Sequence, residues 1–145
     1  MFKHILIPTD GSSLSAIAIK NGVKFAKEID ARVTGLTVTM PFHYYATDAM
    51  QINSTLDQYD TDAQKVATRN LSVLQKAALE AGVQCELLHR VNEYPYEEIV
   101  KVAKEKDCDV IFQASHGRSG AKAFLLGSET NKVLAHCKIP VLVFR

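Results

Sequence analysis

The segment between residues 114 and 130 has the composition of a loop that binds phosphate. It begins ASHGRSG at Ala114 and ends GSET at Gly127, so glycine and hydroxyl residues stand at both ends. Glycines let backbone N–H groups approach phosphate oxygens without a Cβ in the way. The residues from Gly127 open a predicted helix, and a helix N-terminus favours an anion. Ser128 and Thr130 would add hydroxyl donors to such a site, and Ser128 is also predicted to be the N-cap of the helix.

Two basic residues and a histidine lie in the same segment. Arg118 and Lys122 are either phosphate clamps or solvated surface charges, and only their position in the loop favours the first interpretation. His116 has no Ser or Asp partner at the spacing of a catalytic triad. A loop histidine with a structural hydrogen bond is therefore favoured over a catalytic one.

A second polar motif, PTDGSS at residues 8–13, follows the first apolar run of the chain. These residues are typical of a turn followed by a helix N-cap. On composition alone, Asp10 would have only that structural role. Its place after a predicted strand also makes it a candidate for ligand binding.

Chemistry at these two motifs requires elements that hold them together, and the hydrophobic pattern predicts alternating strands and helices. The predicted strands span 4–7, 32–39, 83–91, 109–114 and 141–144, and the predicted helices run to about 29, over 59–81, from Pro95, and over 128–136. Met40 to Asp57 has no clean period, which is typical of a functional loop or lid. Tyr44 and Tyr45 in that segment either stack on a base or cover the sheet edge.

This order predicts an α/β fold in a single domain over residues 1–145. The sheet is expected to be open, five-stranded and mainly parallel, with helices on both faces. In such folds, ligands bind beyond the carboxyl ends of the strands, near the switch in strand order. Both polar motifs follow strands, so both are predicted to lie at that edge.

Composition excludes several function classes. The 145 residues are 47% hydrophobic and 23% charged with a net charge of +1, so nothing indicates a nucleic-acid or membrane partner. Pro8 and Asp10 interrupt the first apolar run too early for a signal peptide or membrane span. The three cysteines lack metal-ligand spacing and are expected to be buried and reduced, which favours the cytoplasm.

The chain resembles the universal stress protein family over its whole length. The opening ILIPTDGS, the strand residues LTV at 36–38, the segment from Pro95 to Ile99 and the closing PVLV at 140–143 carry the resemblance. The family's nucleotide motif is Gly, two residues, Gly, nine residues, Gly, then Ser or Thr. Gly117, Gly127 and Ser128 match it, whereas Ala114 replaces the first glycine.

The resemblance implies an adenine nucleotide alpha hydrolase-like, Rossmann-like fold and a nucleotide site. Asp10 resembles the acidic residue near the ribose and adenine, and Val38 the strand residue whose backbone reads the adenine edge. The implied nucleotide-binding set is Pro8, Thr9, Asp10, Val38, Ala114, His116, Gly117, Arg118, Gly127, Ser128, Glu129 and Thr130. Ala114 would interfere if its position needs a positive φ or direct phosphate contact, at about 1 kcal/mol or more of strain.

The function implied is that of an ATP-binding regulatory protein of the stress response. Mg²⁺ is a possible companion of the triphosphate, and AMP or another adenine nucleotide is an alternative ligand. A homodimer through Val141, Leu142, Val143 and Phe144 is expected. The alternatives are an interaction module without nucleotide binding, which Ala114 favours, and a weak ATPase. No P-loop lysine and no positioned general base is evident, so an enzyme is not expected.

Overall fold

The computed structural model describes residues 1–42, 56–116 and 126–145. The elements in these ranges are β1 (His4–Pro8), α1 (Ser13–Glu28), β2 (Arg32–Thr39), α2 (Leu56–Ala81), β3 (Cys85–Val91), α3 (Pro95–Glu105), β4 (Val110–Ala114), α4 (Ser128–His136) and β5 (Val141–Phe144). Every predicted element is present. The largest shift is at the start of α2, three residues before the predicted Tyr59.

The five strands form one sheet in the order β3-β2-β1-β4-β5, and every strand pair is parallel. The predicted α/β, Rossmann-like architecture is therefore confirmed. β1 lies at the centre, where Ile5 pairs with Val33 of β2 on one side and Val110 of β4 on the other. β2 and β3 lie on one side of β1, and β4 and β5, which follow later in the chain, lie on the other side. The strand order therefore switches between β1 and β4.

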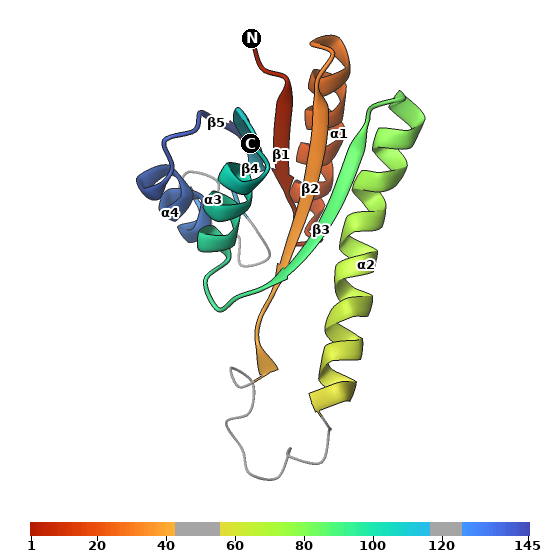
Figure 1. Cartoon of the computed structure of the whole chain (residues 1–145), viewed down its shortest axis with the longest axis vertical. Coiled ribbons are helices and arrows are strands. Elements are labelled where there is room, and N and C mark those ends of the chain that lie inside the picture. The colour runs from red at the N-terminus through yellow and green to blue at the C-terminus, as the bar shows by residue number, and fades with distance from the viewer. Residues whose placement is uncertain (43–55, 117–125) are drawn as a thin grey trace.

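Helices cover both faces of the sheet, α1 and α2 on one face and α3 and α4 on the other (Figure 1). Ile5 and Ile7 of β1 lie in the core under α1 and α2, whereas Leu6 lies in the core under α3. All three are fully buried. A strand with both faces covered needs apolar residues at every position, which explains the continuous apolar run of β1.

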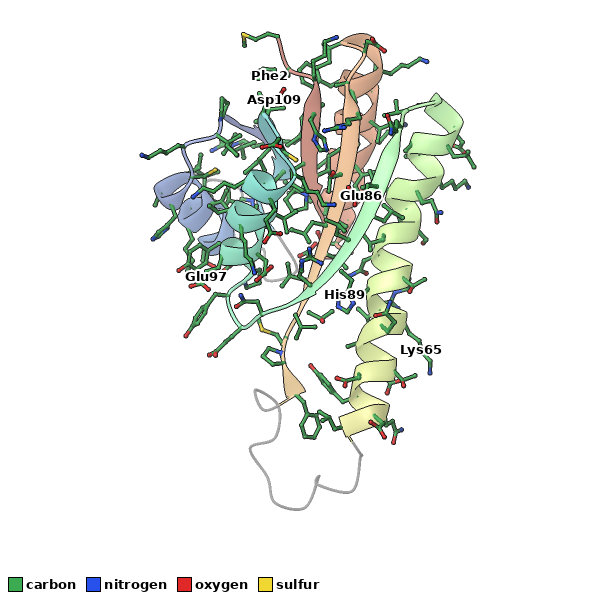
Figure 2. All side chains as sticks on the ribbon, viewed as in Figure 1. Phe2, Lys65, Glu86, His89, Glu97 and Asp109 are labelled. Carbon is green, nitrogen blue, oxygen red and sulfur yellow. The ribbon has the colours of Figure 1, made fainter. Side chains whose placement is uncertain are left out.

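The amino ends of the central strands are held together by polar contacts. The Asp109 carboxylate accepts hydrogen bonds from the backbone N–H groups of Lys3, at 2.8 Å, and His4, at 3.1 Å. Figure 2 shows Asp109 beside Phe2 at this edge of the sheet. His4 Nε2 lies 2.7 Å from the Thr34 hydroxyl of β2. The opposite, carboxyl edge carries the two polar motifs.

The cysteines are unpaired, as predicted, but the expectation that they are all buried was wrong for Cys85 and Cys137. Cys108 is buried, Cys85 and Cys137 are half-buried, and all three are free. Burial raises the pKa of Cys85 and of Cys108 to about 11, so both thiols are protonated and unreactive near neutral pH.

Within the described ranges, no group of three His, Cys, Asp or Glu residues could hold a metal ion. No helix in the described part of the chain is both long and apolar enough to cross a bilayer.

Candidate functional site

The loop between β1 and α1 is fixed by its own short side chains. Ser12 is the N-cap of α1 and accepts a hydrogen bond from Ser15 N at 3.2 Å, as its residue type predicts. Asp10 Oδ1 accepts from Ser12 N at 3.0 Å, and the buried Thr9 hydroxyl lies 3.0 Å from Ser15 Oγ. The loop is therefore a defined turn, and it places the half-buried Asp10 directly after β1.

Hydrogen bonds from residues of β2 and α2 fix the backbone of this loop. Thr9 N donates to the Leu36 carbonyl at 2.8 Å, and Thr37 Oγ1 donates to the Thr9 carbonyl at 2.8 Å. Asn70 Nδ2 on α2 donates in turn to Thr37 Oγ1 at 3.4 Å. The sequence interpretation missed Thr37 and Asn70. The available signal was a polar residue within the apolar stripe of a helix, since Asn70 lies among the buried residues of α2.

The start of α4 is joined to the end of β4 by backbone contacts. Gly127 N donates to the Ser115 carbonyl at 2.8 Å. A Cβ at Gly127 would lie 3.0 Å from that same carbonyl oxygen and 3.3 Å from His116 Cα, so the glycine permits this close approach. The buried Thr130 hydroxyl donates to the carbonyls of Ala114, at 3.1 Å, and Ser115, at 3.2 Å. Its side chain thus holds the two segments together.

Ala114 is the last residue of β4 and pairs with Phe144 of β5. It has the extended backbone of a strand, which an L-residue adopts without strain. The non-glycine residues with positive φ in the described ranges are Asp30 and Asp107, so the strain considered for Ala114 does not arise. Alanine therefore fits the backbone at the position where the family motif has glycine.

The first turn of α4 departs from the sequence interpretation in one respect. Gly127, and not Ser128, is the N-cap residue, and no side chain caps the helix. Ser128 is exposed in the first turn. The prediction that Ser128 serves as the N-cap was wrong, because the Gly127–Ser115 contact holds Gly127 in the non-helical conformation, φ −59° and ψ 154°, of a cap residue.

Glu129 directs its carboxylate away from the start of its own helix. Oε2 accepts a hydrogen bond from Tyr96 N of α3 at 3.0 Å, and Oε1 accepts from Lys132 Nζ at 2.9 Å. Only the backbone of Glu129 is thus left for an anion at the α4 terminus. That terminus offers N–H groups without intrahelical acceptors and a partial positive charge.

Some of the remaining candidate nucleotide-binding residues lie in the part of the chain that the structure describes, and others lie outside it. Pro8 and Val38 are half-buried at the carboxyl ends of β1 and β2. His116 Nδ1 lies 2.9 Å from Ser115 Oγ, which is the structural hydrogen bond expected of this histidine. His116 Nε2 is buried, and none of the described residues bonds it. The candidates Gly117, Arg118 and Lys122, and with them Tyr44 and Tyr45, lie outside the described residues.

The arrangement of motifs, strands and helices agrees with one known family. The profile of the universal stress protein family matches the chain over residues 1–145. The chain belongs to the universal stress protein family. Universal stress protein MJ0531 of Methanocaldococcus jannaschii is 34% identical over 151 aligned residues, covering 100% of this chain and 83% of that protein. Universal stress protein YxiE of Bacillus subtilis is 33% identical over 149 residues and is covered completely, as is this chain.

Solved structures of universal stress proteins share the fold. MJ0577 of Methanocaldococcus jannaschii superposes with a TM-score of 0.83 at 29% identity, covering 99% of this chain and 95% of that chain. A universal stress protein in complex with cyclic AMP gives 0.69 at 20% identity, with 99% and 97% coverage. One from Archaeoglobus fulgidus in complex with dAMP gives 0.64 at 17% identity, with 100% and 98% coverage.

Within the universal stress protein family motif, the described residues have distinct structural tasks. Gly127 provides the close approach of α4 to β4, and Thr130 stabilises it. Ser128, the motif's hydroxyl residue, is exposed at the start of α4. The motif is therefore a strand–loop–helix connection that holds a helix N-terminus near the switch point of the sheet.

Proposed function

We propose that this universal stress protein binds an adenine nucleotide, ATP foremost, and acts as a regulatory protein of the stress response. The observation that carries the proposal is the contact of Gly127 with Ser115. It holds the N-terminus of α4 against the carboxyl end of β4, and β4 pairs with β1, which the Asp10 loop follows. A helix N-terminus, which favours anions, and a carboxylate near the switch point of the sheet support this proposal, because nucleotides bind there in open α/β folds.

The described residues fit a nucleotide. The backbone N–H groups at the start of α4 suit a phosphate, and the exposed Ser128 hydroxyl is available as a donor. His116 Nε2 is a buried polar atom without a partner among the described residues, which a ligand oxygen would satisfy. Ala114 introduces no backbone strain. The solved complexes of related folds with cyclic AMP and dAMP support the same ligand class.

The roles follow from these positions. Gly127, Ser128 and the backbone of Glu129 and Thr130 would hold phosphate oxygens, with His116 beside them. Asp10 would accept hydrogen bonds from the ribose hydroxyls, and Pro8, Thr9 and Val38 would line the nucleoside part. Ala114, Gly117 and Arg118 would complete the phosphate side, and a Mg²⁺ ion would accompany a triphosphate on its oxygens.

Two alternatives are weaker. An interaction module without nucleotide binding was favoured by Ala114, whose ordinary extended backbone removes the part of that argument that rests on strain. A weak ATPase would need a group to activate water. In the proposed site, Asp10 is assigned to the ribose hydroxyls, and the Glu129 carboxylate is bonded to Tyr96 N and Lys132. We therefore propose binding and regulation, in the cytoplasm, without catalytic turnover as the function.

A homodimer through β5 is part of the proposal. β5 is an edge strand of the sheet, with Leu142 40% exposed. An unpaired apolar edge favours association with a second edge. Pairing of Val141 to Phe144 with the same strand of a second copy would cover it symmetrically.

The test is calorimetric titration of the protein, freed of co-purified nucleotide, with ATP, AMP and cyclic AMP, with and without Mg²⁺. Inorganic triphosphate serves as the matched ligand without a nucleoside. Saturable binding at one site per chain, tighter for ATP than for triphosphate, is the expected result. Absence of binding of any nucleotide at millimolar concentration would overturn the proposal in favour of the interaction module.

A further inference from the structure

We propose that Asn70 of α2 is a positioning residue of the nucleotide site, which fixes the β1–α1 loop and, through it, the Asp10 carboxylate. This role rests on the nucleotide binding proposed above for the identity of the ligand. It concerns the nucleoside part of that site, and it makes α2 a structural support of the site.

Asn70 is a polar residue at a core position. Its exposed fraction is 5%, and it lies in the same buried stripe of α2 as Ala67 and Leu74, both at 0%. Burial of an amide without hydrogen bonds is unfavourable, whereas an apolar residue would pack this helix face without that cost. The amide is therefore expected to have a specific polar task.

That task is visible in the chain of hydrogen bonds toward the loop. Asn70 Nδ2 donates to Thr37 Oγ1 at 3.4 Å, and the Thr37 hydroxyl donates to the Thr9 carbonyl at 2.8 Å. Thr37 is 1% exposed, so the connection is shielded from water. Hydrogen bonds in series polarise one another in such surroundings. The peptide between Thr9 and Asp10 is thus anchored to α2.

Asn70 also contacts the residue on the other side of Asp10. Gly11 has φ +77°, and a Cβ there would lie 2.2 Å from Asn70 Oδ1 and 2.8 Å from its Cγ. The amide therefore occupies the space above Gly11 and leaves no room for a side chain. Asn70 thus acts on both neighbours of Asp10, on Thr9 indirectly through the Thr37 hydroxyl and on Gly11 through direct packing.

The phosphate side of the site is built separately. The contacts among Ser115, Gly127 and Thr130 join β4 to α4 and involve no residue of α2. Loss of the Asn70 amide should therefore disturb the nucleoside part alone. We expect Asn70→Ala to weaken ATP binding about tenfold and to leave the affinity for inorganic triphosphate unchanged, because loosened positioning lowers affinity without removing the binding group.

The first test is a double-mutant cycle of Asn70→Ala with Asp10→Ala, read by calorimetry with ATP and with inorganic triphosphate. If Asn70 acts through Asp10, Asn70→Ala lowers the ATP affinity of the wild-type protein. The same substitution then causes no further loss of ATP affinity in the Asp10→Ala variant. Ser72→Ala is the control, since Ser72 is exposed on the same helix and bonds only the nearby Arg69 carbonyl in the described structure. Additive losses, equal losses for both ligands, or wild-type ATP affinity would overturn the proposal.

The second test needs no ligand. Amide hydrogen exchange of the nucleotide-free protein should be at least tenfold faster at Gly11 and Ser12 in Asn70→Ala than in the wild type, with β1 unchanged. Ser72→Ala should leave both amides at wild-type rates. Unchanged exchange at Gly11 and Ser12 in Asn70→Ala would overturn the positioning role. If the wild type binds no nucleotide, the proposed function fails, while this measurement still decides whether Asn70 holds the loop.

Discussion

The Glu129 carboxylate accepts a hydrogen bond from the backbone N–H of Tyr96 at 3.0 Å, so the first turn of α4 caps the first turn of α3. The N-cap residue of α3, Tyr94, makes no capping hydrogen bond with its own side chain. Pro95 at the helix start suits this terminus, and Glu129 supplies the missing acceptor. The two helices on this face of the sheet are therefore joined at their N-termini.

We expect Glu129→Ala to lower the free energy of unfolding by about 1 kcal/mol, the usual effect of losing a helix cap. Urea denaturation followed by circular dichroism measures it. Glu129→Gln is the matched variant, because its amide oxygen can still accept from Tyr96 N, and it should stay within about 0.5 kcal/mol of the wild type. An equal loss in both variants would mean that the charge of Glu129, rather than its hydrogen bond, stabilises α3.

At Gly127, even one added methyl group is expected to weaken nucleotide binding. The Cβ of Gly127→Ala would lie 3.0 Å from the Ser115 carbonyl oxygen, so α4 must move by a few tenths of an ångström. We predict a loss of ATP affinity of about tenfold and a loss of stability of about 1–3 kcal/mol, typical of overpacking. Calorimetry and urea denaturation measure the two effects.

The control is Gly82→Ala, at the turn after α2. Gly82 has φ +66°, and a Cβ there would make only an ordinary contact, 3.7 Å from Lys27 Nζ, so alanine introduces backbone strain of about 1–2 kcal/mol away from the site. This variant should lose stability and keep ATP affinity. Wild-type affinity in Gly127→Ala would contradict the assignment of the phosphate site.

Two histidines make stability depend on pH. Desolvation lowers the pKa of His4 below its ordinary value of 6.5, with the nearby Arg32 adding to the effect, and burial lowers that of His89. Figure 2 shows His89 between β3 and α2, where Nδ1 lies 3.0 Å from Gln64 Oε1. The unfolded chain binds protons at these sites more readily than the folded chain does.

Stability is therefore fully present above pH 6.5, the ordinary histidine pKa, and is lost as pH falls through that value toward the lower folded pKa values. Each histidine contributes a slope of at most about 1.4 kcal/mol per pH unit. Urea denaturation between pH 5 and 8, about the range in which histidine titrates, should show this fall in the wild type and a smaller one in His89→Gln. An unchanged slope in that variant would exclude His89 as a contributor.

Leu142→Glu should break the proposed dimer. A carboxylate at this 40% exposed position of β5 would be brought near its symmetry mate in a paired edge. We expect at least a tenfold rise in the dimer dissociation constant, measured by sedimentation velocity over a concentration series. Leu79→Glu, on the 81% exposed Leu79 of α2, is the matched control. A wild-type dissociation constant in Leu142→Glu would locate any dimer contact elsewhere.

The elements could be predicted where the local chemistry is unambiguous. β2 was predicted to the residue because Arg32 to Thr39 is β-branched and apolar, and α4 because Gly127 and Ser128 mark its start. The start of α2 was misplaced because Leu56 follows a segment without a clean period, and because the interpretation did not use Thr55 and Gln58, which have the spacing of a capping box. The N-cap of α4 was misassigned because hydroxyl residues usually cap helices, whereas here a tertiary contact selects Gly127.

The sequence predicted those site residues that can be recognised by their position after a strand, but not those that reach the site through long-range contacts. Asp10 and Gly127 follow strands, so the alternating pattern already places both at the carboxyl edge of the sheet. Thr37 and Asn70 could not be assigned to the site in this way, because their contacts join residues 28 and 33 positions apart. Glu129 was grouped with the nucleotide ligands because its neighbours belong to the motif, yet its carboxylate caps α3.

The central place of β1 also has a consequence for how the protein folds. β1 pairs with β4 across a large sequence distance, since the Asp109 carboxylate and His4 N are 105 positions apart. Contacts of such high sequence separation form slowly, because the entropy of closing a long loop must be overcome first. During synthesis, β1, α1 and β2 can associate early. The Ser115–Gly127 contact, however, can form only after the start of α4 has left the ribosome, so the proposed nucleotide site is completed late in synthesis.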